Sequence, residues 1–320
     1  MAQEDKTLVT PPALELTDFN WVGDRYQGKV RDTYQRDGLR VLVATDRLSA
    51  FDRVLTTVPG KGQILTHMAS YWFERTRHVV PNHVVAVPDP CVMVGREVSI
   101  IPIEVIVRGF LAGSAWRDYR SGKQTSGVAF PPGMREFDQL REPVVTPSTK
   151  EAIGKHDQPI SEAEIVRQGV VSANVWDEVR SKALELFALA ARELSARGLL
   201  FVDTKYEFGL VDGAVVLADE IHTLDSSRFW LTDSYERNVA SGGAPEMLDK
   251  EPIRQWLIER GFSGEGDVPS ISDEYRAELI QHYVRSCERI TGRACMLNLE
   301  EPKGRIERNL RSYFGMSTTA

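Results

Sequence analysis

The residues with the clearest chemical potential lie in "FVDTKYEFGL", residues 201–210. Side chains alternate between the two faces of a strand, so Asp203, Lys205 and Glu207 are expected on one face. The other face is expected to carry the core side chains Val202, Thr204, Tyr206 and Phe208. Carboxylates beside a lysine suit Mg²⁺ carrying nucleotide phosphates, because Mg²⁺ prefers one or two carboxylates with phosphate and water completing its octahedron. The alternative is a solvated strand face with salt bridges.

The following segment, "LVDGAVVLADE" at 210–220, predicts a hairpin that turns at Asp212 and Gly213. A two-residue loop would pair position 205 with 220 and 207 with 218, leaving Asp219 on the apolar face. A three-residue loop with Gly213 left-handed would pair 205 with 219 and 207 with 217. We expect the second register, because it places Asp219 beside Lys205 and diagonal to Glu207, where both carboxylates reach one metal ion.

A glycine near the N-terminus is a candidate phosphate contact. "YQGKVRDTY" at 26–34 places Gly28 and Lys29 inside an otherwise β-like run, where a glycine lets backbone amides approach a phosphate. The run matches neither of the established glycine-rich nucleotide motifs. A β-bulge is therefore the competing explanation for Gly28.

The stretch "IIPIEVIVRGFLAGSAW" at 100–116 carries three further candidates. Glu104 lies in an apolar run, where a carboxylate is costly to bury without a partner; an edge strand with a solvent outlet is the alternative. Arg108 ends the strand, and Ser114 is expected to cap a short helix. Helix N–H groups and a guanidinium together favour a phosphate or carboxylate site, and a capped helix beside a surface arginine remains the alternative.

Alternation and helical periodicity indicate the elements that must position these residues. Short β-rich runs dominate up to residue 110, with one amphipathic helix at 61–78. Later helices are expected at 114–122, 172–198, 273–292 and 300–315. The sequence thus predicts an α+β fold, with a β-rich N-terminal lobe (1–110), a mixed and more helical C-terminal lobe (111–320), and a ligand cleft between them.

Composition limits the possible partners. The net charge of −7 gives no global basic field, so nonspecific nucleic-acid or membrane binding is not expected. The three scattered cysteines form no CxxC pair, which argues against a disulfide framework and a structural zinc site. With no signal-like or membrane-spanning run, we expect a cytoplasmic protein, either a monomer or a small homo-oligomer.

Several motifs, in order, resemble the SAICAR synthetase family of purine biosynthesis. They are "GKVRDTY" at 28–34, "DRLSAFD" at 46–52, "IPIEVIVRGFLAGSAW" at 101–116, "TPSTK" at 146–150, "HDQPIS" at 156–161, "FVDTKYEFGL" at 201–210 and "LADEIHTLDSSRFW" at 217–230. The resemblance implies a two-lobed fold whose N-terminal lobe is similar to that of protein kinases. It also implies an ATP- and Mg²⁺-dependent ligase that joins L-aspartate to the carboxylate of carboxyaminoimidazole ribonucleotide, releasing ADP and phosphate. Because a carboxylate is a poor electrophile, we expect the γ-phosphoryl group of ATP to be transferred to it first, giving an acyl phosphate that the aspartate amine attacks.

The resemblance also implies roles for the residues of the nucleotide and the metal. Gly28, Lys29 and Arg31 would lie over the ATP phosphates, and the strand around Glu104 would lie against adenine. Glu207 and Asp219 would hold Mg²⁺.

The remaining roles concern catalysis and the ribonucleotide. Lys205 would face the transferring phosphate or the substrate carboxylate, and Asp203 would lie near the reacting imidazole. The residues expected to bind substrate are Arg108, Ser114, Lys150, Ser227 and Arg228. His156 and Asp157, in the same loop as Lys150, are carried over without a defined role. No motif is assigned beyond about residue 240.

Two other functions stay open on the residues alone. A small-molecule kinase would share the metal hairpin and the Gly28 loop but would phosphorylate a hydroxyl group and need no aspartate. A catalytically silent regulator would bind ATP without releasing ADP. A second anion site at Arg108, Ser114 and Arg228 favours the enzyme, because a silent regulator has no use for it.

Overall fold

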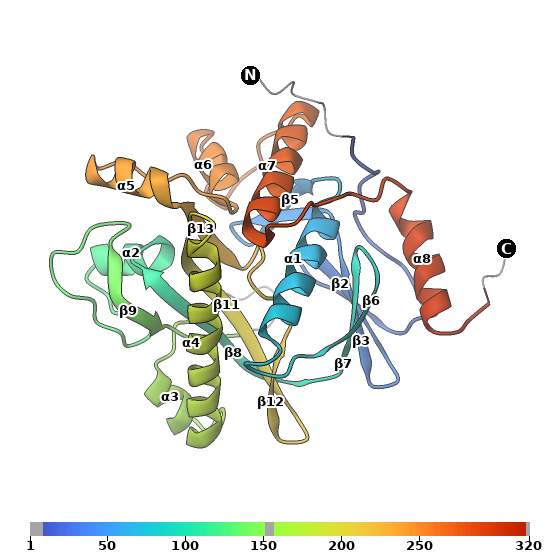
Figure 1. Cartoon of the computed structure of the whole chain (residues 1–320), viewed down its shortest axis with the longest axis horizontal. Coiled ribbons are helices and arrows are strands. Elements are labelled where there is room, and N and C mark those ends of the chain that lie inside the picture. The colour runs from blue at the N-terminus through green and yellow to red at the C-terminus, as the bar shows by residue number, and fades with distance from the viewer. Residues whose placement is uncertain (1–8, 151–156, 318–320) are drawn as a thin grey trace. The chain divides into compact units, whose positions relative to one another are not determined.

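The computed structural model describes residues 9–150 and 157–317 and has the expected α+β architecture (Figure 1). The chain forms two compact units, each made of separate segments. Unit 1 contains residues 1–70, 84–97 and 250–320, and unit 2 contains residues 71–83 and 98–249. This division differs from the expected boundary at residue 110, because the C-terminal helices pack with the N-terminal sheet.

Unit 1 is built on a five-stranded antiparallel sheet in the order β1-β2-β3-β7-β6. Its strands are β1 (Arg25–Gln27), β2 (Arg31–Arg36), β3 (Leu39–Ala44), β6 (Val84–Asp89) and β7 (Val92–Arg96). A separate hairpin joins β4 (Arg47–Ala50) to β5 (Arg53–Thr57). The helices of unit 1 are α6 (Glu251–Glu259), α7 (Asp273–Thr291) and α8 (Pro302–Tyr313), and helix α1 (Lys61–Thr76) begins in this unit.

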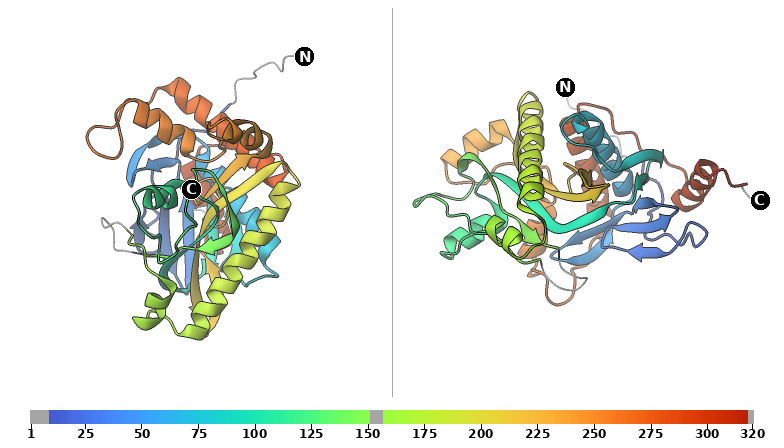
Figure 2. Two further views of the ribbon diagram at one scale, coloured as in Figure 1. Left: turned by 90° about the vertical axis from the view of Figure 1, so that its left-hand side faces the viewer. Right: turned by 90° about the horizontal axis from the view of Figure 1, so that it is seen from below.

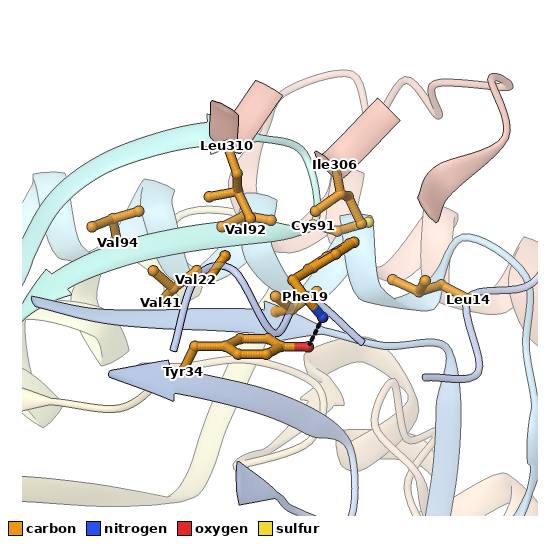
Figure 3. Close-up of a cluster of buried hydrophobic side chains, with 11 residues drawn as sticks. Leu14, Phe19, Val22, Tyr34, Val41, Cys91, Val92, Val94, Ile306 and Leu310 are labelled. Carbon is orange, nitrogen blue, oxygen red and sulfur yellow. Dashed lines mark hydrogen bonds between the residues drawn. The ribbon is translucent and has the colours of Figure 1, made fainter. Parts of the chain in front are cut away.

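The core of unit 1 joins the two ends of the chain (Figure 3). Phe19 and Tyr34 pack with Val41 and Val92 of the sheet, and Ile306 and Leu310 of α8 belong to the same buried cluster. The Phe19 N–H donates to the Tyr34 hydroxyl at 3.1 Å. Helix α8 lies beside β6 in Figure 1, and this packing makes the last helix part of the first sheet's core.

A buried ion pair also fixes α8 in unit 1. Arg305 Nε donates to Asp89 Oδ2 at 2.9 Å, and both side chains are almost completely buried. Such a pair is strongly destabilising when only one partner is removed.

Unit 2 is built on a six-stranded antiparallel sheet with β8 and β11 at its centre. Its strands are β8 (Ser99–Phe110), β9 (Gln139–Val145), β10 (Ser148–Thr149), β11 (Leu199–Val211), β12 (Ala214–Ala218) and β13 (Ser227–Leu231). Helix α4 (Ala173–Ser195) lies along this sheet in both views of Figure 2. Phe187 of α4 stacks on Phe201 of β11 with ring centroids 4.8 Å apart.

The helix signals of the sequence are confirmed where capping residues mark the ends. Ser172 and Ser272 cap the N-termini of α4 and α7 through their hydroxyl oxygens. Gly198 and Gly292 adopt positive φ just beyond the same helices. The short helices α3 (Glu162–Arg167), α5 (Thr232–Ala240) and α6 were not predicted. No helix in the described part of the chain is long and apolar enough to cross a membrane.

The register that we expected for the hairpin of β11 and β12, with a three-residue loop, is wrong. Glu207 pairs with Ala218 and Val211 with Ala214, so the loop contains only Asp212 and Gly213. Both loop residues have positive φ, 51° and 82°, which is the geometry of the two-residue turn that suits the twist of antiparallel strands.

The expected alternation along β11 is also interrupted. The pairing of β11 with β13 shifts between Phe201 and Asp203. As a result, Phe201 and Tyr206 both contact the His222 ring, whereas Val202 packs in another cluster with Trp230. The bulge changes which residues share a face, while Asp203, Lys205 and Glu207 keep their common side.

Candidate active site

The first cluster of the candidate site surrounds Lys205 in unit 2. The Lys205 ammonium contacts the Glu104 carboxylate and lies 3.7 Å from Glu207 Oε1. Lys150 contacts the other oxygen of Glu207. Glu104 and Glu207 are direct partners across β8 and β11, so the lysine offsets a repulsion that would otherwise destabilise the pair.

Burial and charge act in opposite directions on this cluster. Burial alone would lower the pKa of Lys205, but the carboxylates of Glu207, Glu104 and Asp219 raise it. Burial raises the pKa of Glu104, and Lys205 opposes that rise. Lys205 therefore stays protonated, and the expectation of a solvated face with salt bridges does not describe this buried network.

The strand register does not place Asp219 beside Lys205. The backbone conformation of Asp219 itself brings its side chain to the cluster. It follows the last residue of β12 and has φ of 64°, a conformation uncommon outside glycine. Its carboxylate is close enough to raise the pKa of Lys205. An unusual backbone angle thus places the second expected metal ligand near the first.

The carboxyl oxygens of the cluster are ligands of the kind that Mg²⁺ prefers. The carboxylates of Glu104, Asp157, Glu207 and Asp219 interact with one another or with Lys205, and the cations among them are Lys150 and Lys205. Four carboxyl groups and two lysine side chains thus meet in this cluster. Within the described ranges no group of three or more His, Cys, Asp or Glu is arranged to hold a metal ion.

The second cluster surrounds Asp203, which lies two residues before Lys205 on β11. Asp203 Oδ2 accepts from Arg108 Nη1 at 3.0 Å and from Arg228 Nη1 at 2.7 Å. Arg108 also donates to the hydroxyls of Ser114 and Thr146 at 3.0 and 2.8 Å. Burial lowers the pKa of Arg108, with Asp203 opposing the shift. Asp249 Oδ2 also lies 4.0 Å from Arg228 Nε, so two guanidiniums and two carboxylates meet here, and the guanidinium N–H groups are the candidate donors to an anion.

Two of the residues expected beside these arginines occupy different positions. Ser114 is not the N-cap of its helix, because α2 (Gly113–Arg120) begins one residue before it. The N-cap position is occupied by Ala112, which has no side chain that could cap the helix. The Ser227 hydroxyl bonds to the Thr204 hydroxyl at 2.7 Å. Ser227 pairs with Thr204 and Arg228 with Asp203, so Ser227 lies on the opposite face from the arginines.

Gly113 is expected to tolerate no side chain. It has φ of 59°, and a Cβ atom there would lie 2.5 Å from Arg228 Nη2. Gly113→Ala should therefore move Arg228 away from Asp203. With Arg228 in the ribonucleotide site, as the resemblance implies, the substitution should raise the KM for the ribonucleotide about tenfold or more, with a smaller effect on the KM for ATP. Gly122→Ala is a matched control, because Gly122 also has positive φ but open space around it. Equal kinetic effects of the two substitutions would contradict the expected displacement.

Unit 1 contains the remaining expected residues. Gly28, Lys29 and Arg31 lie in or beside the turn between β1 and β2, where the Gly28 N–H donates to the Arg31 carbonyl at 2.8 Å. The exposed Lys29 ammonium pairs with Asp52 at 2.5 Å. His156 lies outside the described residues. The turn thus joins two paired strands, as a β-like run with an interior glycine predicts.

Sequence reasoning missed one residue that supports the arginine cluster and one polar residue in the core of unit 2. Thr146, the first residue of the "TPSTK" motif, holds Arg108. His222 is buried, accepts or donates a hydrogen bond at 2.7 Å with the Tyr206 hydroxyl, and has its pKa lowered to about 3 by burial. Both lie in motifs of the resemblance, but neither has a spacing that indicates its partner.

Comparisons with known proteins agree with the fold. The family model described as SAICAR synthetase matches residues 24–270. A putative phosphoribosylaminoimidazole-succinocarboxamide synthase 2 of Mesorhizobium japonicum is 46% identical over 298 residues, which is 90% of this chain and 95% of that protein. A phosphoribosylaminoimidazole-succinocarboxamide synthase of Legionella pneumophila is 42% identical over 92% of this chain and 96% of its own.

Solved structures show the same similarity. A SAICAR synthase from Saccharomyces cerevisiae complexed with SAICAR has a TM-score of 0.78 and 30% identity, covering 88% of this chain and 99% of that one. A type-2 SAICAR synthetase in complex with ADP has a TM-score of 0.65 and 25% identity, covering 85% and 99%.

These findings define an ATP-dependent carbon–nitrogen ligase. The chain belongs to the SAICAR synthetase family, because the family model matches most of the chain and relatives above 40% identity span nearly all of it. The reaction is the condensation of 5-amino-1-(5-phosphoribosyl)imidazole-4-carboxylate with L-aspartate in purine biosynthesis, with conversion of ATP to ADP and phosphate. The alternatives of a small-molecule kinase and a silent regulator are thereby set aside.

Proposed function

We propose that the ligation passes through an acyl phosphate formed at the Lys205 cluster. A carboxylate oxygen of the ribonucleotide attacks the γ-phosphorus of ATP, and ADP leaves. The aspartate amine then attacks the acyl carbon, the C–O bond to phosphate breaks, and the amine loses a proton as the amide forms. A carboxylate needs this activation because its oxygen is a poor leaving group, and positioning with charge stabilisation supplies most of the catalysis.

The observation that carries this proposal is the juxtaposition of two clusters on one side of β11. Lys205 and Glu207 belong to the first cluster, and Asp203 to the second. Residues two apart on a strand are about 7 Å apart, a distance suited to one substrate whose reacting carboxylate and phosphate bind at neighbouring sites. Lys205 is placed to stabilise charge on the transferring phosphoryl group.

We further propose that Glu207 and Asp219 hold Mg²⁺. When bound, the ion would neutralise phosphate charge during transfer. The protein's own part is to hold the Glu207 carboxylate in place through its contacts with Lys150 and Lys205.

The arginine cluster is proposed to bind the ribonucleotide phosphate. The guanidinium groups of Arg108 and Arg228 both donate to Asp203, and that of Arg108 also donates to the Ser114 hydroxyl, which further restricts its orientation. Asp203 acts in this proposal by orienting both arginines; its place beside the imidazole stays a prediction. Ser227 is left out of the phosphate site because its hydroxyl faces Thr204.

We propose that the turn of Gly28, Lys29 and Arg31 contacts the phosphates of ATP. We also propose that Glu104 acts in the Lys205 cluster, in addition to the contact with adenine that the family resemblance implies. A cytoplasmic location is also proposed, supported by three cysteines that are free and buried. The monomer or small homo-oligomer remains a prediction.

An oxygen-label experiment tests the acyl phosphate. With ¹⁸O in the ribonucleotide carboxylate, each turnover should place one labelled oxygen in inorganic phosphate and leave the other in the amide product. Separately, ATP labelled at its β–γ bridge should scramble that label when the ribonucleotide is present and aspartate is absent. Unlabelled phosphate would exclude the intermediate, and label transfer without scrambling would indicate that phosphorylation follows aspartate attack.

A further inference from the structure

The turn at Gly28–Val30 of unit 1, which is proposed to contact the ATP phosphates, has two of its carbonyl groups hydrogen-bonded to one buried arginine. Arg47 Nη2 donates to the Gly28 carbonyl at 3.0 Å, and Arg47 Nε donates to the Lys29 carbonyl at 3.1 Å. Its side chain is only 4% exposed and forms an ion pair with the fully buried Asp32 at 2.8 Å. Arg47 belongs to the "DRLSAFD" motif, for which no role has been assigned so far.

These two hydrogen bonds determine where the turn's N–H groups point. In a planar trans peptide the C=O and the N–H point in opposite directions. Because the carbonyls of Gly28 and Lys29 face Arg47, the N–H groups of Lys29 and Val30 face away from it. Neither N–H group has a hydrogen-bond partner among the described residues. Successive outward amides of this kind form a concave anion site.

Asp32 and Thr45 complete the support. Asp32 Oδ2 accepts from the Thr17 N–H at 2.6 Å, so the carboxylate that holds Arg47 is itself fixed to the chain. The Thr45 N–H and hydroxyl both donate to the Val30 carbonyl, at 3.0 and 2.8 Å. All three carbonyls of the turn, from Gly28 to Val30, are therefore directed to fixed donors.

We propose that Arg47, anchored by Asp32, is a positioning residue that builds the ATP phosphate site by turning the Gly28–Val30 carbonyls inward and their neighbouring amides outward. Arg47 does not touch the nucleotide in this proposal. It rests on the proposed function of the turn as the phosphate contact. An arginine is required because its planar fork reaches two carbonyls and a carboxylate together, whereas a lysine ammonium is a single point of charge.

The test compares Arg47→Lys with Arg305→Lys in the full-length chain. Both substitutions weaken a buried arginine–aspartate pair of unit 1, but Arg305 donates to Asp89, Cys91 and the Glu300 carbonyl and not to the turn. Calorimetric titration with ADP should show a Kd raised about tenfold or more for Arg47→Lys only. The melting temperature should fall for both variants. Asp32→Asn serves as a second variant if Arg47→Lys does not fold, and it should weaken ADP binding in the same direction.

A spectroscopic readout separates this inference from the proposed function. In protein labelled with ¹⁵N-valine and ¹⁵N-lysine, the amide signals of Val30 and Lys29 should shift when ADP is added. If these signals do not respond, the turn is not the phosphate site, and the proposed function of the turn is wrong together with the inference. If they respond, but Arg47→Lys binds ADP as tightly as Arg305→Lys does, only the positioning role is wrong.

Discussion

Glu207→Gln is expected to lower kcat by about 10²–10³-fold while the protein stays folded. Glutamine keeps the shape of Glu207 but removes the charge that Lys150 and Lys205 contact. The substitution also removes one of the two proposed Mg²⁺ ligands. The rate should be measured at saturating ribonucleotide, aspartate and ATP, over a range of Mg²⁺ concentrations.

The Mg²⁺ dependence separates a metal ligand from a structural carboxylate. A weakened site should need more Mg²⁺ for half-maximal rate, so added Mg²⁺ should recover part of the activity of Glu207→Gln. Glu193→Gln is the control, because Glu193 is another largely buried unit 2 carboxylate in ion pairs, with Arg75 and Arg197. Near-normal turnover of Glu207→Gln, or an unchanged Mg²⁺ dependence, would remove Glu207 from the metal role.

Asp203→Asn is expected to lower the free energy of unfolding by about 3 kcal/mol or more. Asp203 is the common carboxylate of Arg108 and Arg228, and its removal takes away the ion-pair partner of Arg108 and leaves Arg228 with Asp249, whose carboxylate is 4.0 Å away. Burial already lowers the pKa of Arg108, so a neutral neighbour makes its charge costlier. Denaturant unfolding measures the loss, and the KM for the ribonucleotide should rise because Arg108 loses its ion-pair partner and Arg228 loses the nearer of its two carboxylates.

A double variant distinguishes charge imbalance from simple loss of packing. Adding Arg228→Gln to Asp203→Asn removes one of the two guanidiniums and should recover part of the stability. The same addition should raise the KM for the ribonucleotide further, because it removes a proposed phosphate contact. Additive losses of stability in the double variant would show that Asp203 and Arg228 are not coupled.

The sequence predicted correctly which side chains of β11 lie on one side of the strand, but it did not predict the hairpin register or the backbone conformation of Asp219. Alternation placed Asp203, Lys205 and Glu207 on one side of a strand, and that placement is confirmed. The hairpin register was wrong because it assumed that Asp219 needs a strand position to reach Lys205. The structure uses a tight turn and then a left-handed residue at Asp219 itself, and residue alternation carries no information about such a break.

Long helices were predicted well because their signals are local. Ser172 before α4 and Gly292 after α7 act within a few residues of the helix ends. The division into units could not be predicted in this way, since it depends on Ile306 packing with Val41 and Val92 from the other end of the chain. Likewise, nothing local to Arg47 indicates that it holds carbonyls about 18 residues earlier.

The segmented make-up of unit 1 sets an order for folding during synthesis. Unit 2 is complete once Asp249 has emerged from the ribosome, whereas unit 1 needs residues 250–320 as well. Translation proceeds at about 5–20 residues per second, so the sheet, whose last strand ends at Arg96, waits tens of seconds for helix α8. During that interval the side of the first sheet that later receives Ile306 and Leu310 lacks its covering helix.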